Sequence, residues 1–523
     1  MYMKKTIYLC AVTLLTMASC NDYLDTVPSR GDNEVLKSGE QIEALFNNSE
    51  IYNSKVGFLG ASGDDIDLTM EMYNEIGYAT DAYISGLTFS IDDLANYQYG
   101  DTHWESEYNK IFTANLIINE IDNVEGLADN DRAQYLAQAH FMRALAYWNL
   151  AQSYCMPYST ETKDGLGLPL KQSTSYEESV VRATLQETYD LIEADLNEAL
   201  NSPKTDIDMR WWVSKPAAQA MLARFYLFTQ DYEKAADLAR QALQSSKATL
   251  HDYNTLTLVE IPAMSPYGDE GVVMRSELYS YSPNQMADYQ EAFYSQYFSV
   301  ESGVYFIPSE TLLGIYDTDN DLRYEQFFNK NGLWDAWLCG YGDDIMYRKF
   351  YHYIWGDFIP SGPTVPEMIL TEAEALARQN HVSEAMDCVN QLRKARMRQG
   401  TDGWQLTASG QQEAIEQILE ERHREMPFIM RWFDIRRLAF NETTADDVVV
   451  ERSFFSVEQN IVDTSKGYLY TLPVKSKRYA APLPNKDIAR SGNQIIQNEY
   501  TDQDVQKKEI DVPDSGWGDD WNW

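Results

Sequence analysis

The sequence predicts a mainly α-helical protein, in which helical hairpins form a scaffold that a long, loop-rich insertion interrupts. Three observations support this fold class. Apolar residues recur at helical spacing along most of the chain, and two separate segments repeat one hairpin pattern. The stretch between them, residues 250–366, is instead rich in Gly, Pro, Tyr, Trp and Asp. With 523 residues, 44% of them apolar, the chain can bury a large core.

The two repeated segments are residues 216–246 and 367–397. In each, small and apolar residues recur at positions that face one another across a short turn, so that two antiparallel helices can approach closely. This is the spacing of tetratricopeptide (TPR) repeats. The helices expected at about 130–154 and 184–200 would form one more hairpin, over about 130–200. The matching positions are Leu222, Ala223, Tyr226, Ala235, Ala239 and Ala242 in one segment and Ala373, Leu376, Ala385, Val389 and Leu392 in the other.

The remaining segments have weaker patterns. Residues 60–103 are expected to be loop-like, and 284–299 is the one long helix expected within the insertion. From Thr443 onward the pattern is mixed and indicates short strands. Further helices are expected at about 104–122, 410–424 and 428–438.

The N-terminus indicates export. Residues 1–19 have a basic start and an apolar run that is too short to cross a bilayer, as in a secretory signal peptide. Met17-Ala18-Ser19-Cys20 resembles a bacterial lipobox, in which Cys20 becomes the acylated N-terminus of the mature protein. Residues 20–37 are then expected to be a polar tether. A plain signal peptide followed by an incidental cysteine remains the alternative.

The chain is strongly acidic. It has 81 Asp and Glu against 42 Lys and Arg, which gives a formal charge of −39 at pH 7. This charge argues against nucleic-acid binding and against adsorption to an anionic membrane, so membrane contact is expected through the lipid anchor only. Solubility at a crowded cell surface accounts for the acidity most simply.

The acidic residues do not mark a catalytic site. Glu372 and Glu374 are two apart on a helix and so face different directions, whereas Glu421 and Glu425 share a helix face. Arginines beside the second pair predict a salt-bridged surface. Since a glycosidase needs two carboxyl groups across a cleft, and nothing marks such a pair, the sequence predicts that the protein is not an enzyme.

The sequence also predicts no cofactor and no metal site. His381 and His423 are isolated in the sequence from other types of metal ligand. Residues 317–321 begin like a calcium loop, but Leu322 stands where such a loop requires Gly.

Several motifs together resemble the SusD/RagB family of outer-membrane nutrient-binding lipoproteins. With Cys20 and the two hairpins, their order and spacing match that family over nearly the whole chain, with residues 38–500 as a single domain. Residues 501–523 extend beyond the usual end as an acidic, Trp-containing tail. The motifs are Trp104-Glu105-Ser106-Glu107-Tyr108, Arg143-Ala144-Leu145-Ala146-Tyr147, Gly167-Leu168-Pro169-Leu170, Glu421-Arg422-His423-Arg424-Glu425, Arg431-Trp432-Phe433-Asp434-Ile435-Arg436-Arg437 and Pro482-Leu483-Pro484.

This resemblance implies a SusD-like fold and a place on the outer cell surface. It also implies a non-catalytic role, in which the protein captures an oligosaccharide and delivers it to a SusC-like TonB-dependent transporter. Some relatives hold structural calcium, which leaves a calcium site elsewhere in the chain open. The chain departs from the family pattern at Thr364 and at Ile429-Met430. The alternative function is a TPR-type protein–protein adaptor of the cell envelope without a small-molecule ligand.

Sugar binding requires flat aromatic faces together with amides and carboxylates, and the resemblance implies that such groups lie on loops that project from the scaffold. Residues 64–99 and 334–355 fit this description. Each aromatic residue there can equally pack in the core, and Trp104 and Trp432 are expected to be structural. The candidate ligand-binding residues are Asp64, Asp65, Tyr97, Tyr99, Trp334, Trp337 and Tyr341.

Overall fold

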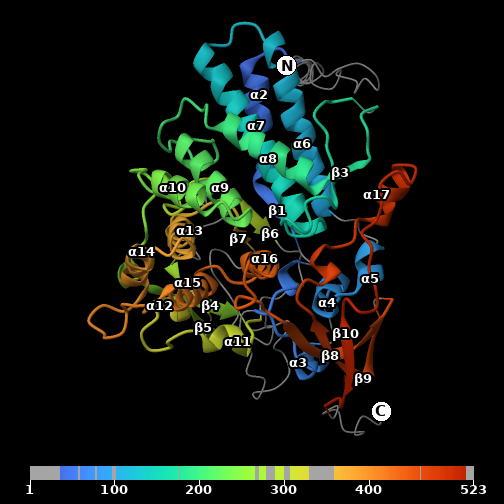
Figure 1. Ribbon diagram of the computed structural model, residues 1–523, viewed down its shortest axis with the longest axis vertical. Coiled ribbons are helices and arrows are strands. Elements are labelled where there is room, and N and C mark those ends of the chain that lie inside the picture. Colours follow the sequence, from blue (N-terminus) through green and yellow to red (C-terminus); the bar gives the residue numbers. More distant parts are fainter. Residues whose placement is uncertain are drawn as a thin grey trace, which may run out of the picture.

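Helices form most of the regular structure in the computed structural model of the protein (Figure 1), which confirms the predicted mainly α fold. The structure describes residues 36–56, 59–76, 79–96, 102–175, 177–264, 270–277, 289–299, 307–328, 358–459 and 461–513. The main helices are α6 (Thr102–Glu120), α7 (Asp129–Tyr154), α8 (Leu185–Ala199), α9 (Lys215–Phe228), α10 (Tyr232–Ala242), α13 (Val365–Arg378), α14 (Val382–Arg396), α15 (Gln411–Glu425) and α16 (Ile429–Leu438).

The three predicted hairpins are present as α7–α8, α9–α10 and α13–α14. They stack in sequence: α8 contacts α9, α10 contacts α13, and α13 also contacts α15, while α6 lies against α7. The turns of the last two hairpins are alike, because Gln230 and Asn380 each adopt a φ of +65° two residues before the second helix begins. The repeat seen in the sequence is therefore a repeat of backbone geometry as well.

The first helices of these two hairpins begin with the same chemistry. The hydroxyl of Ser214 accepts a hydrogen bond from a backbone N–H in the first turn of α9, and Thr364 does the same for α13. Each cap is followed two residues later by a proline, Pro216 or Pro366, whose fixed φ suits the start of a helix. Thr364, a departure from the family pattern, thus acts as a helix cap.

Two local predictions were wrong. Residues 60–103 hold three short helices, α3 (Met70–Ile76), α4 (Asp81–Thr88) and α5 (Ile91–Ala95). Every residue from Ala82 to Thr88 is buried, so α4 has no polar face to give it a helical period in the sequence.

The helix expected at 284–299 is also absent from the part of it that is described. Residues 289–299 form a turn that leads into the strand β6 (Tyr297–Ser299). Long-range pairing decides this conformation: β6 lies between β1 (Asn53–Lys55) and β7 (Phe358–Pro360), parallel to the first and antiparallel to the second. This small sheet joins residues 53–55 to two strands of the insertion.

The other strands form small antiparallel sheets. Beyond residue 443 the predicted strands are present as β8, β9 and β10, in the order β10-β9-β8. Their bounds and those of the remaining elements are β2 (Leu166–Pro169), β3 (Arg182–Thr184), β4 (Leu258–Met264), β5 (Glu270–Ser276), β8 (Val450–Glu458), β9 (Ile461–Leu472), β10 (Gln506–Ile510), α2 (Gly39–Phe46), α11 (Glu310–Gly314), α12 (Leu322–Phe327) and α17 (Asn485–Arg490).

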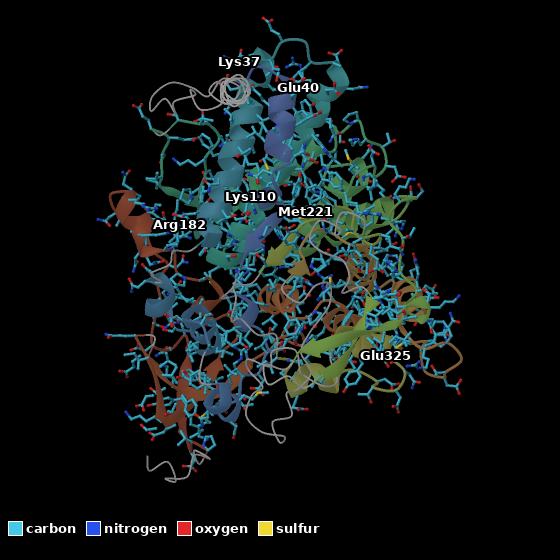
Figure 2. All side chains as sticks on the ribbon, turned by 180° about the vertical axis from the view of Figure 1, so that it is seen from behind. Lys37, Glu40, Lys110, Arg182, Met221 and Glu325 are labelled. Atoms are coloured by element: carbon cyan, nitrogen blue, oxygen red, sulfur yellow. The ribbon has the colours of Figure 1, made fainter. Side chains whose placement is uncertain are left out.

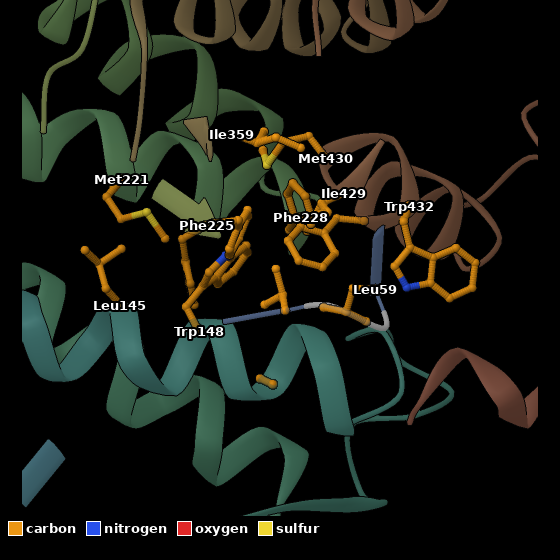
Figure 3. Close-up of a cluster of buried hydrophobic side chains, with 14 of the residues drawn as sticks. Leu59, Leu145, Trp148, Met221, Phe225, Phe228, Ile359, Ile429, Met430 and Trp432 are labelled. Carbon is orange, nitrogen blue, oxygen red and sulfur yellow. The ribbon is translucent and has the colours of Figure 1, made fainter. Parts of the chain in front are cut away.

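A buried apolar cluster joins the hairpins to α16 (Figure 3). Trp148 of α7 is almost completely buried, and its ring meets that of Phe228 on α9 edge-on, with centroids 5.0 Å apart. Ile429 and Met430 of α16 are buried in the same core. The Ile429-Met430 departure from the family pattern is therefore a packing feature.

Buried ion pairs attach the insertion to the scaffold. Arg323 of α12 is fully buried and contacts both Glu421 and Glu425 of α15, at 2.7 and 3.0 Å. Arg396 of α14, also fully buried, joins Glu425 to Glu291 at 2.8 and 2.9 Å. The predicted salt-bridged surface at Glu421 and Glu425 was wrong, because the pair lies in the interior and its arginines come mostly from distant elements.

A second buried group of charges lies between α13, α15 and α16. Glu374 contacts Arg437 at 2.7 Å and Arg378 at 3.0 Å, and Asp434 contacts Arg422 and Arg437, both at 2.7 Å. Burial alone raises the pKa of Glu374, but its arginine neighbours outweigh that effect and hold the pKa well below its usual range. These carboxylates are ionised structural groups.

We expect Glu421→Ala to lower the free energy of unfolding by about 3–5 kcal/mol, because it leaves buried arginines without their counter-charge. Arg323, Arg393 and Arg424 all contact this carboxylate. The neighbouring Glu420 provides a matched control, since its side chain is 52% exposed and it contacts Arg424 only. Glu420→Ala should cost less than about 1 kcal/mol. Urea unfolding of the two variants measures the difference, and equal losses would contradict a buried network.

Candidate ligand-binding region

The 64–99 stretch begins against a segment of the insertion. The backbone N–H of Ser309 donates to the carbonyl of Asp65 at 2.7 Å, and its hydroxyl donates to the carbonyl of Asp64 at 2.7 Å. The N–H of Asp67 donates to the carbonyl of Ile307 at 3.0 Å. The start of the 64–99 stretch is thus held against a segment of the insertion, upstream of the 334–355 stretch.

Asp65 belongs to the interior, which corrects its prediction as a ligand-binding residue. It is completely buried, one of its carboxylate oxygens contacts His423 Nε2, and the other accepts a hydrogen bond from the backbone N–H of Phe428 at 2.6 Å. Phe428 has a φ of +65°, which is strained for a side chain of this size. Both oxygens of the Asp65 carboxylate are therefore engaged in holding the turn between α15 and α16.

Asp64 forms a bidentate ion pair with Arg431 of α16. The two carboxylate–guanidinium distances are 3.0 and 2.9 Å, and the side chains are only 13% and 11% exposed. Burial alone raises the pKa of Asp64, but the attraction of Arg431 outweighs it and lowers that pKa to about 2. Asp64 is thus a charged anchor at the edge of the predicted region.

The backbone just before Asp64 is held from the other side by β8. The guanidinium of Arg452 donates to the carbonyls of Ala61 and Gly63. Burial lowers the pKa of Arg452 to about 10, which still leaves it charged at neutral pH. Two arginines from different elements therefore hold residues 61–64 in place.

The position of His423 in the sequence suggested that it is isolated from other metal ligands. In the structure it lies beside two carboxylates. Among the described residues, Asp64, Asp65 and His423 place ligand atoms within 4.8 Å of one another. Their oxygens are already bound to Arg431, His423 and the N–H of Phe428, and a guanidinium beside the site repels a cation. The group fits an ion-pair cluster and does not fit a metal site.

The calcium-like segment forms a turn and a helix cap. Asp317 accepts hydrogen bonds from the backbone N–H groups of Asp319 and Asn320, at 3.1 and 3.2 Å. Asp321 caps α12 and pairs with Arg323 at 2.8 Å. His381 lies near the surface, 3.2 Å from Glu384.

The other predicted residues have different outcomes. Trp104 and Trp432 are buried, which confirms their structural role. The predictions that fall outside the described residues are those for Cys20, Tyr97, Tyr99, Trp334, Trp337 and Tyr341.

Sequence reasoning missed the partners of Asp64 and Asp65. Arg431 and His423 follow them by more than 350 positions, so no local pattern links them. The available signal for these partners was in the motifs that contain His423 and Arg431. Both motifs combine acidic with basic residues close to aromatic ones, which is a composition that indicates ion pairs.

Comparison with known protein families shows which family the chain belongs to. A family model described as "Starch-binding associating with outer membrane" matches residues 22–227, and the model of the SusD family matches residues 365–500. The chain belongs to the SusD family. Among the described helices of this SusD-family protein, none combines the length and the apolarity that crossing a membrane requires.

Individual SusD relatives are distant but align along most of the chain. SusD-like protein P2 of Formosa agariphila is 25% identical, over 95% of this chain and 99% of its own length. SusD-like protein P38 of the same organism is 23% identical, over 64% of this chain and 71% of its own.

Solved SusD structures show the same fold. A SusD superfamily protein from Bacteroides vulgatus superposes with a TM-score of 0.63 at 15% identity, covering 89% of this chain and 100% of that one. A laminarin-binding SusD-like protein gives a TM-score of 0.55 at 16% identity, covering 88% and 99%.

Asp64→Asn should reduce the pH dependence of stability. The pKa of Asp64 falls from its ordinary value of 3.8 to about 2 on folding, so its contribution is complete above about pH 4 and is lost as the pH falls towards 2. The wild type should exceed the variant by about 2 kcal/mol at pH 5, and the difference should vanish near pH 2. Urea unfolding across this pH range measures it. The exposed Asp319, changed to Asn, should give a small difference throughout, and a constant Asp64 difference would contradict the ion pair.

Proposed function

We propose that this SusD-family protein is a lipid-anchored protein of the outer cell surface that binds an oligosaccharide and delivers it to a SusC-like TonB-dependent transporter. Family membership carries the proposal, since two models of SusD-type proteins match the first and last parts of the chain. The laminarin-binding protein with the same fold supports a glycan as the ligand. The protein has no role in catalysis in this proposal, because the close carboxylates Glu421, Glu425 and Glu374 are buried and paired with arginines.

The ligand is expected among the aromatic residues of the two predicted loops. Tyr97, Tyr99, Trp334, Trp337 and Tyr341 remain candidates on their sequence pattern. The start of the 64–99 stretch supports the assignment, because a binding site needs a rigid attachment to the scaffold. Ion pairs and backbone hydrogen bonds at Asp64, Asp65 and Ser309 form such an attachment.

The adaptor alternative has less support. A TPR adaptor needs an open groove along its stacked helices, and in the proposed assembly the insertion and the transporter would occupy that face. Binding of the purified ectodomain to a glycan panel separates the two functions, since an adaptor without a small ligand would bind no glycan.

The anchor is tested by Cys20→Ala. We expect this variant to remain unacylated and to leave the membrane fraction, because no other acylation site is proposed and the strongly acidic chain has no electrostatic attraction to lipid. Fractionation and palmitate labelling measure both effects. A variant that still labels and stays with the outer membrane would show that Cys20 is not the anchor.

The proposed transporter partner is tested by extracting the wild-type protein from the membrane with a mild detergent. Affinity purification should retain a TonB-dependent transporter, because a stable cap on a transporter needs a large interface, above about 2,000 Å². Recovery of the chain alone at full yield would count against delivery to a transporter.

The ligand is tested by calorimetry with neutral and acidic oligosaccharides. We expect affinities between micromolar and millimolar, roughly −4 to −8 kcal/mol, with neutral oligosaccharides preferred by this acidic protein. Trp334→Ala, Trp337→Ala and Tyr97→Ala should each cost about 2 kcal/mol where the aromatic ring stacks on the sugar. Trp404→Ala, at a half-buried position between α14 and α15, is the control. Unchanged affinity in all three variants would remove these loops from the site.

A further inference from the structure

A hollow opens in the half of the molecule that contains α2 and the start of α7. It lies between the end of α2, the start of α7 and the segment 203–212, and its volume is about 550 Å³, which is the size of small-molecule sites. Figure 1 shows α2 near one end of the long axis and α3 and α11 near the other, and Figure 2 shows the same separation between Glu40 and Glu325. Because α11 directly follows Ser309, the hollow is distant from Asp64 and Asp65, where the 64–99 stretch begins.

One wall of the hollow is a rigid aromatic cluster. Trp212 meets the ring of Phe46 edge-on at 5.3 Å and lies tilted against Tyr135 at 5.9 Å. The hydroxyl of Tyr135 donates to Glu43 Oε1 at 2.7 Å, which ties the start of α7 to α2. Tyr135 and Trp212 are buried, so this wall exists without a ligand to organise it.

Trp211 supplies an available aromatic surface beside that wall. Its carbonyl accepts hydrogen bonds from Tyr52 Oη and Gln138 Nε2, both at 3.1 Å, so its backbone position is held. Its side chain is only half-buried, lines the hollow and stacks on no other aromatic ring of the described chain. Met209, 37% exposed, extends the apolar surface. The indole packs in part against the core, and the part that faces the hollow is the kind of aromatic surface that the C–H face of a pyranose contacts.

Polar groups surround this indole with unused hydrogen-bonding capacity. Asn47, Asn130 and Asp131 are exposed, line the hollow, and make no side-chain hydrogen bond to any residue that the structure describes. By contrast, Gln134 donates to the carbonyl of Val213 at 2.9 Å and accepts from Ser202 at 2.9 Å, so it serves the fold. Two amides and a carboxylate beside an aromatic face match the hydroxyl pattern of a sugar.

The charges of the hollow exclude an acidic ligand. Glu43 and Asp131 line it, and Lys204, a cation in the described lining, lies 3.0 Å from Asp208 and is thereby partly neutralised. Anionic sugars and phosphates would meet net negative charge within a Debye length, about 8 Å. A neutral ligand with many hydroxyl groups meets no such repulsion.

We propose that this hollow, with Trp211 as its stacking platform, is a second binding site for a neutral oligosaccharide. It depends on the proposed function only for the general class of ligand, because it uses none of the loop residues predicted to bind glycan. Asn47, Asn130 and Asp131 bind the hydroxyl groups, and Tyr135 and Trp212 form the wall that keeps Trp211 in position.

The experiment follows the indole N–H signals of the mature chain by NMR, with the Trp211 signal assigned from a Trp211→Phe variant. The probes are maltoheptaose and laminarihexaose as neutral glucans and an oligouronate as the acidic counterpart, each up to about 10 mM. The Trp211 signal should shift with at least one neutral probe and not with the oligouronate, while that of the half-buried Trp404 stays in place.

An unmoved Trp211 signal with both neutral probes overturns the proposal, and an equal shift with the oligouronate overturns the assignment to neutral ligands. Calorimetry then separates the two sites. Trp211→Ala should weaken binding at one site about tenfold or more and leave the site sensitive to Trp334→Ala unchanged. If the Trp334 and Trp337 variants lose all binding and Trp211→Ala loses none, the loops bind the glycan and the hollow does not.

Discussion

The buried ion pairs of Arg323 and Arg396 are the constraint on which the arrangement of the molecule depends. Both guanidinium groups lie in the interior and share Glu425, and Arg396 also lies over the ring of Tyr253, 3.9 Å from its centroid. A buried charge is tolerated only where its partner is placed well, so a small displacement of α12, α14 or α15 would leave a charge unpaired. The pairs therefore act less as a source of net stability than as a requirement that the insertion occupy one position on the scaffold.

The same requirement extends to the base of the predicted glycan loops. Asp64 and Asp65 join the chain near its start to α15 and α16 through Arg431, His423 and the backbone of Phe428. The helical hairpins, the insertion and the N-terminal segment are thus fixed to one another by polar contacts within the protein. Loops that leave such a base can change in sequence and specificity without changing the scaffold, which suits a family whose distant members share a fold at 13–19% identity.

Local patterns predicted the scaffold, and long-range contacts decided the rest. The hairpins of residues 216–246 and 367–397 were predictable because caps, prolines and alanines act within a few residues of one another. Residues 289–299 form a turn and a strand because β1 and β7, distant in sequence, pair with β6. Asp65 looked like a loop residue for the same reason, since its partner His423 follows it by 358 positions. In the sequence, Trp211 is notable only as one of two adjacent tryptophans. Whether its side chain is exposed depends on how α2 packs against the start of α7, which the sequence around it does not indicate.

Two weak sites on one rigid body would change how the protein treats ligands of different length. A polysaccharide that reaches both the loops and the hollow beside Trp211 is held at a high effective concentration near the second site once the first is occupied, so a long chain binds far more tightly than either site alone allows. A short oligosaccharide occupies only one site and leaves at the rate of that site. The buried ion pairs hold α12, α14 and α15 in one arrangement, and a scaffold of fixed shape would keep the distance between the two proposed sites constant, which such discrimination by length requires.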